Sequence, residues 1–143
     1  MEILEFRGSY RFLSNFYPAD VSYELITYPT LEHAFQAAKS LSMVDRMKIG
    51  MASSPGKARR MGRAIHADNF RRDWEDVKVG IMEQLLADKF SDPMLRKLLL
   101  DTGSAHLEEG NNWGDRFWGT VNGEGLNNLG KLLMQLRENL GGN

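Results

Sequence analysis

Residues 28–39 read YPTLEHAFQAAK, and this stretch decides where the first helix of the chain begins. Thr30 is a good N-cap, because its hydroxyl can accept a hydrogen bond from the free N–H groups of a first helical turn. The apolar residues after it recur on one helical face: Leu31, Ala34, Phe35 and Ala38. Glu32 then occupies the second helical position, where free N–H groups and the helix dipole favour a negative charge. Such a carboxylate suits a base or a stabiliser of positive charge, although acids in first turns often only stabilise the helix.

The remaining sequence predicts mainly helices, preceded by two short strands. β-Branched and aromatic residues bounded by Gly8, Pro18 and Pro29 predict strands over residues 2–7 and 21–27, with a structured aromatic loop between them. Capping residues and apolar spacing predict further helices over 43–52, 54–63 and 70–90, from Pro93, and from Leu126 to a stop at Gly141 and Gly142. The predicted fold class is α+β, predominantly α-helical, as a single domain over residues 1–143 with a few short N-terminal strands.

Composition excludes several classes of function. The net charge is −1, so no global field draws the chain to nucleic acid or anionic lipid, and any anion site must be local. There is no cysteine, which excludes disulfides, thiolate metal sites and a cysteine nucleophile. Neither a signal peptide nor an apolar run of membrane-spanning length is visible. We therefore expect a cytoplasmic protein with no membrane partner.

A second carboxylate stands out in DRFWG, residues 115–119. Asp115 lies between Trp113 and Trp118, within residues 104–124, whose glycines and asparagines predict a loop. An aspartate in such a loop is often only a turn former. Exposing two indoles is costly, however, unless they pack or stack on a ligand. Carboxylates with tryptophans nearby therefore suggest cleavage of a bond between a sugar and a flat ring.

A cluster of basic residues is a candidate phosphate site. Four positive charges occur with no acid between them, on Lys57, Arg59, Arg60 and Arg63. At helical spacing the three arginines share a sector that can hold a phosphate by forked hydrogen bonds, although a solvated helix face gives the same pattern. Lys39 comes two helical turns after Glu32 and lies on roughly the same face.

The sequence gives no indication of a metal or nucleotide cofactor. The spacing of His33, His66 and His106 does not match that of metal ligands. Common nucleotide-binding glycine motifs and the hydrolase nucleophile motif are absent.

Six motifs occur in an order that resembles the NADAR (YbiA-like) family over nearly the whole chain. They are FLSNFYP at 12–18, YPTLEHAFQAAK at 28–39, SSPGKARRMGR at 53–63, W-x-x-x-K at Trp74 and Lys78, D-x-x-W-G from Asp115, and NNLGKLLMQLR at 127–137. Several motifs in one order are far more specific than any one of them. The resemblance implies a fold of the YbiA-like type and an N-glycosidase that cleaves a bond between a ribose carbon and nitrogen without a cofactor.

The resemblance also implies site residues. The family's acids correspond to Glu32 and Asp115, and its tryptophans to Trp74 and Trp118. We expect Glu32 to stabilise the charged sugar or activate water and Asp115 to orient the ribose or the water, with the two roles open to exchange. The predicted substrate-binding residues are Arg7, Asn15, Phe16, Lys39, Arg63, Trp74, Lys78, Trp113, Trp118, Gly119 and Asn127.

Family members act on more than one substrate, so alternatives stay open. The expected substrate is a phosphorylated ribosylamino-pyrimidine of riboflavin synthesis. A first alternative is removal of ADP-ribose from guanine, with nucleic acid a partner only as ADP-ribosylated substrate. A second is a module that binds NAD or ADP-ribose without cleaving it, and a third is an adaptor that uses the last helix. The loop from Thr120 to Leu126 departs from some members, which leaves the leaving base open, and the sequence predicts no oligomeric state.

Overall fold

The computed structural model describes residues 1–141, which fold into two units. One unit is Asn15–Lys89, and the other joins Met1–Ser14 to the chain from Phe90 onwards. The described residues form six α-helices, one 3-10 helix and four short strands. The predicted α+β, predominantly helical class is therefore confirmed. None of the helices within residues 1–141 is long and apolar enough to cross a membrane.

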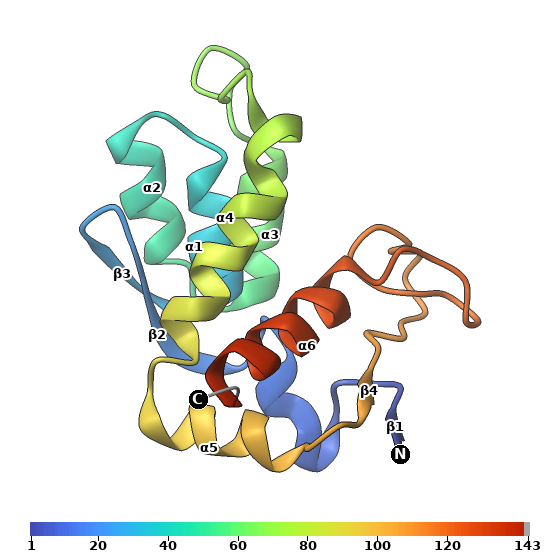
Figure 1. Cartoon of the computed structure of the whole chain (residues 1–143). Helices are drawn as coiled ribbons and strands as arrows, with labels where there is room; N and C mark the ends of the chain where they lie inside the picture. Colours follow the sequence, from blue (N-terminus) through green and yellow to red (C-terminus); the bar gives the residue numbers. More distant parts are fainter. Residues whose placement is uncertain (142–143) are drawn as a thin grey trace. The chain divides into compact units, whose positions relative to one another are not determined.

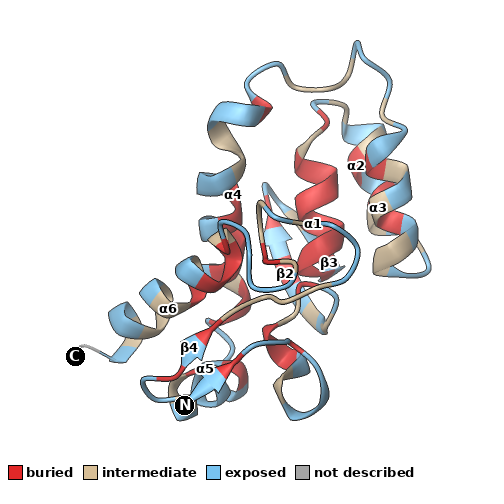
Figure 2. Ribbon diagram, turned by 90° about the vertical axis from the view of Figure 1, so that its right-hand side faces the viewer, coloured by how far each residue is buried: buried red, intermediate tan, exposed pale blue. Residues whose placement is uncertain are grey.

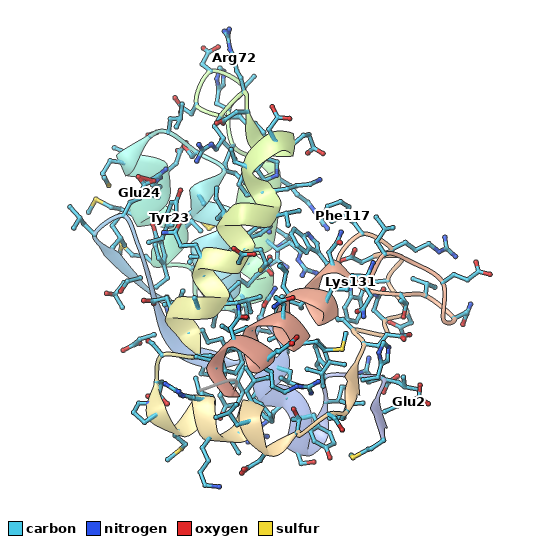
Figure 3. All side chains as sticks on the ribbon, viewed as in Figure 1. Glu2, Tyr23, Glu24, Arg72, Phe117 and Lys131 are labelled. Carbon is cyan, nitrogen blue, oxygen red and sulfur yellow. The ribbon has the colours of Figure 1, made fainter. Side chains whose placement is uncertain are left out.

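The unit Asn15–Lys89 begins with a hairpin of β2 (Pro18–Tyr23) and β3 (Ile26–Thr30), paired antiparallel. The prediction of one strand over 21–27 is wrong, because the chain reverses at Glu24 and Leu25. These two residues have φ angles of +45° and +75°, in the left-handed region that usually favours glycine. Figure 3 shows Tyr23 and Glu24 at this end of the hairpin. A turn without glycine or asparagine gave no signal in the sequence.

The centre of this unit is α1 (Leu31–Ala38), which begins where the Thr30 cap predicts. The Thr30 side chain accepts a hydrogen bond from the His33 N–H at 3.1 Å. Every residue of α1 is buried, as its continuous red ribbon in Figure 2 shows. Around α1 pack α2 (Met43–Gly50), α3 (Pro55–Arg63) and α4 (Trp74–Lys89), visible together in Figure 1. A helix enclosed in this way positions its side chains rigidly.

The predicted starts of α2 and α3 are confirmed, although α2 ends at Gly50 and not at residue 52, and the predicted start of α4 is wrong. Ser54 caps α3, and its side chain accepts from the Lys57 N–H at 3.1 Å. The helix predicted from residue 70 begins only at Trp74, because Phe70 forms an isolated β-bridge with Ser40. Phe70 is therefore paired with the segment that follows α1, and a turn at Arg72 and Asp73 leads into α4.

The other unit pairs β1 (Glu2–Ile3) in parallel with β4 (His106–Leu107) and contains the 3-10 helix η1 (Gly8–Leu13). The strand predicted over 2–7 thus ends at Ile3, and β4 interrupts the predicted loop. Its α-helices are α5 (Pro93–Asp101) and α6 (Asn128–Gly141). The last helix, predicted from Leu126, begins at Asn128, and Leu126 is exposed. The helix includes Gly141, one of the two glycines predicted to end it, and the other, Gly142, lies outside the described residues.

Candidate active site

Glu32 is fixed at the start of α1 by its backbone and by burial. Its N–H donates to the carbonyl of Asn15 at 3.1 Å, which ties the FLSNFYP segment to the first turn of the helix. The residue is only 4% exposed. A carboxylate so enclosed needs hydrogen-bond donors or cations nearby. Its partners therefore decide what it can do.

The two partners of the Glu32 carboxylate share one of its oxygens. Gln36 Nε2 donates to Oε2 at 2.6 Å, and Arg59 Nε donates to the same oxygen at 3.4 Å. The Arg59 guanidinium also lies 4.8 Å from the ring centre of Phe16. Within residues 1–141, Oε1 of Glu32 accepts no hydrogen bond. This second oxygen is the one that can face a reacting group.

Cationic side chains gather beside this carboxylate. Burial lowers the pKa of Lys39; Glu32 opposes this shift, and Arg63, Arg59 and Lys78 add to it in that order. The five side chains therefore lie close enough for their charges to interact. Lys78 is paired with Glu75 at 2.7 Å, which leaves three cations near one acid. The local charge is positive, although that of the chain is slightly negative, and this suits a phosphate.

Trp74 connects Lys39 to an open hollow on the same unit. The Lys39 ammonium lies 5.8 Å from the Trp74 ring centre and 6.0 Å from that of Phe35. Trp74 itself packs against Phe35 at 5.0 Å and against Phe70 at 6.5 Å between ring centres. A hollow of about 380 Å³ is lined by Ile65, Ala67, Phe70, Arg71, Arg72, Trp74 and Glu75. Figure 3 shows Arg72 on the loop between α3 and α4.

Asp115, in the other unit, shapes its own loop. Its Oδ1 accepts hydrogen bonds from the N–H groups of Phe117 at 3.0 Å and Trp118 at 2.9 Å, as an aspartate turn does. Its N–H donates to Asn111 Oδ1 at 3.0 Å, and Asn111 Nδ2 donates to its carbonyl at 2.8 Å. Within the described residues, Oδ2 makes no hydrogen bond. Asp115 therefore combines the turn role with one uncommitted oxygen.

The other predicted site residues of this unit differ in how many contacts they make with the rest of the protein. The Asn127 side chain accepts from the Glu109 N–H at 3.0 Å and donates to the Leu107 carbonyl at 2.9 Å. A Cβ at Gly119 would overlap the Glu109 carbonyl oxygen, so only glycine fits there. Trp118 packs edge-on against Phe117 at 4.8 Å, whereas Trp113 is 54% exposed. Arg7, which precedes η1, is exposed.

The NADAR domain profile matches residues 5–141. The chain belongs to the NADAR family. It is 44% identical over 129 residues to N-glycosidase YbiA of Shigella flexneri, covering 89% of this chain and 79% of that protein. It is 38% identical to the chloroplastic riboflavin biosynthesis protein PYRR of Zea mays, covering 89% of this chain and 23% of that protein. The NMR structure of Escherichia coli YbiA superimposes with a TM-score of 0.82 at 40% identity, covering 98% of this chain and 83% of that one.

In this NADAR protein the predicted site residues divide between the two units. The unit Asn15–Lys89 contains Asn15, Phe16, Glu32, Lys39, Arg63, Trp74 and Lys78. The other unit contains Arg7, Trp113, Asp115, Trp118, Gly119 and Asn127. Sequence reasoning did not identify Gln36, although it follows Glu32 by four residues and so shares its helical face. That spacing was the one available signal.

Proposed function

We propose that this protein is an N-glycosidase that hydrolyses the ribose C–N bond of a phosphorylated ribosylamino-pyrimidine, a type of intermediate in riboflavin biosynthesis. One observation carries the proposal: the buried Glu32 carboxylate keeps one oxygen uncommitted while Lys39, Arg59 and Arg63 surround it with positive charge. The names of the Shigella and maize relatives support the activity and the class of substrate, respectively.

Glu32 has the properties that breaking a ribosyl C–N bond requires. As the bond lengthens, positive charge builds on the sugar ring, and a nearby carboxylate stabilises it. The uncommitted Oε1 is suited to this task or to taking a proton from the attacking water. The hydroxyl of the water ends on the sugar carbon, and the leaving nitrogen receives a proton. Free base and ribose phosphate are the products.

The cationic side chains would hold the phosphate of this substrate. Arg59 and Arg63 are four residues apart on α3 and so project from the same side of the helix. Arg59 has a 31% exposed side chain and uses Nε toward Glu32, and among residues 1–141 its terminal nitrogens make no hydrogen bond, so they can form a forked contact. A phosphorylated ribose is therefore expected to bind more tightly than the unphosphorylated riboside.

Asp115 is the second candidate carboxylate, which the family resemblance supports. Its Oδ2 is uncommitted, so it can accept from a ribose hydroxyl while Oδ1 keeps the turn. Asp115→Asn retains an oxygen for the turn and removes the charge. We expect this variant to fold normally and to hydrolyse the substrate more slowly.

The decisive experiment follows release of free base from 5-amino-6-ribosylaminouracil phosphate by chromatography. We expect Glu32→Ala to lower kcat at least about 100-fold with the fold intact, because general-base and charge-stabilising groups contribute that much. Glu83→Ala, which removes an exposed glutamate from α4, is the matched control and should retain full activity. Near-full activity of Glu32→Ala would remove Glu32 from the mechanism.

The same assay on ADP-ribosylated guanosine in DNA tests the main alternative. Glu32-dependent release of guanine, with no cleavage of the pyrimidine riboside, would replace the proposed substrate. Binding of ADP-ribose without cleavage of either compound would favour a binding module.

A further inference from the structure

Gln36 contains a buried polar atom that has no hydrogen-bond partner among residues 1–141. The residue is 4% exposed, and its Oε1 is a buried carbonyl oxygen without a donor. Leaving such a group unpaired costs about 1–3 kcal/mol, so a native structure that retains one needs a reason. The other end of the amide supplies it, because Nε2 donates to Glu32 Oε2 at 2.6 Å.

The orientation of the amide is set by its neighbour. If the amide were turned over, its oxygen would face the Glu32 carboxylate, and two acceptors would then oppose each other at hydrogen-bond distance. The observed orientation therefore places the donor on Glu32 and leaves the acceptor unpaired. The Gln36 amide thus makes its hydrogen bond to Glu32 and leaves its own oxygen without a donor.

Gly62 on α3 makes room for this arrangement. A Cβ at Gly62 would overlap Oε1 of Gln36 and lie 2.8 Å from its Cδ. Gly62 lies in the last turn of α3 and has no positive φ, so no left-handed backbone conformation requires a glycine there, and glycine is a weaker helix former than alanine. Gln36 and Gly62 are therefore each locally unfavourable, and both allow the Gln36 amide to lie against the Glu32 carboxylate.

We propose that Gln36 is a positioning residue that orients the Glu32 carboxylate, with Gly62 providing the space it needs. Its short hydrogen bond fixes Oε2, so that Oε1 is held in one direction toward the reacting sugar. The inference rests on the role of Glu32 in the proposed function. It explains why a buried acceptor is left without a partner and why α3 has a glycine at this position.

The first test is Gln36→Met, which keeps the length of the side chain and removes the donor. We expect kcat to fall about 10- to 100-fold, as a small misplacement of a catalytic group does, with KM within about twofold of wild type. The melting temperature should stay within about 4 °C of wild type, because loss of the bond to Glu32 is offset by removal of the unpaired oxygen. Gln84→Met, on an exposed position of α4, is the matched control.

The second test uses Gly62→Ala, whose Cβ should displace Gln36 and lower kcat in the same way. Gly80→Ala is its control, since a Cβ at Gly80 meets no atom within 4 Å. If both residues act through the position of Glu32, Gly62→Ala combined with Gln36→Met should lose no more activity than the worse single variant. Losses that multiply would indicate separate structural damage and overturn the proposal.

Failure of this inference is distinct from failure of the proposed function. If wild-type protein releases no base from any ribosyl substrate, the proposed function fails. If wild type and Gln36→Met are equally active, the positioning role alone is wrong. A Gln36→Met variant with a melting temperature far below wild type would also contradict it, because Gln36 would then serve stability, and this measurement needs no substrate.

Discussion

Lys39 is the residue whose charge depends most clearly on the site around it. Burial is the largest cause that lowers its pKa; Glu32 opposes this shift, and Arg63, Arg59 and Lys78 add to it. The ammonium therefore loses its proton at a lower pH than the value of about 10.4 for an ordinary lysine. We expect kcat/KM for the phosphorylated riboside to fall as the pH rises, and the fall to begin below about pH 10.4, because the neutral amine no longer attracts the phosphate. The parameter kcat/KM is the one to follow, since its pH dependence reports groups of the free enzyme.

Two comparisons test whether deprotonation of Lys39 causes this fall in kcat/KM at high pH. Lys39→Arg should move the fall to higher pH, because a guanidinium stays charged. The unphosphorylated riboside should show a much smaller fall, since it has no phosphate for the ammonium to hold. If kcat/KM of Lys39→Arg fell at the same pH as that of wild type, a group other than Lys39 would be responsible for the fall.

The sequence predicts that Glu32 lies in the first turn of a helix, as the structure shows, but it does not predict which side chains hold the Glu32 carboxylate. Glu32 could be predicted because a helix start is a local pattern, and Lys39 because it follows two turns later. Gln36 could not, because its role lies in an unpaired oxygen and in a glycine on another helix. Similarly, the turn bonds of Asp115 depend on backbone N–H positions that loop composition does not specify.

Among the elements, the β2–β3 hairpin has a turn that its sequence does not favour. Leu25 has a φ of +75° and is fully exposed, so its side chain costs conformational energy with little packing in return. We expect Leu25→Gly to raise the free energy of unfolding by about 1 kcal/mol, because glycine adopts this conformation without strain. Denaturant unfolding would measure it. Leu41→Gly, at an exposed leucine without a positive φ, should instead lower stability.

The same contrast explains which elements the sequence predicts. Thr30 and Ser54 place the starts of α1 and α3 correctly because a cap acts on N–H groups three residues away. The sequence does not predict the hairpin, because Glu24 and Leu25 are not turn residues by type. The apolar spacing predicts too early a start for α4, because Phe70 bridges to Ser40, a pairing that local periodicity does not reveal.

For the whole molecule, one buried lysine, Lys89, makes the free energy of unfolding depend on pH. Lys89 is 1% exposed, and burial lowers its pKa to about 7. In the unfolded chain the pKa returns to about 10.4, so between these values the unfolded state binds the additional proton. The contribution of Lys89 to the free energy of unfolding therefore rises with pH from about 7 to about 10.4, by at most about 1.4 kcal/mol per pH unit.

The difference between wild type and Lys89→Met isolates this effect from other titrating groups. The methionine is uncharged at every pH, so wild type should gain stability relative to the variant as the pH rises from 7 to 10. Below pH 7 the difference should be constant, because both states of Lys89 are then protonated. Urea unfolding at pH 6, 7, 8, 9 and 10 measures it, with Lys131→Met, at an exposed lysine of α6, as the control. A difference between wild type and Lys89→Met that does not change with pH would mean that Lys89 keeps its ordinary pKa and is hydrated in the folded protein.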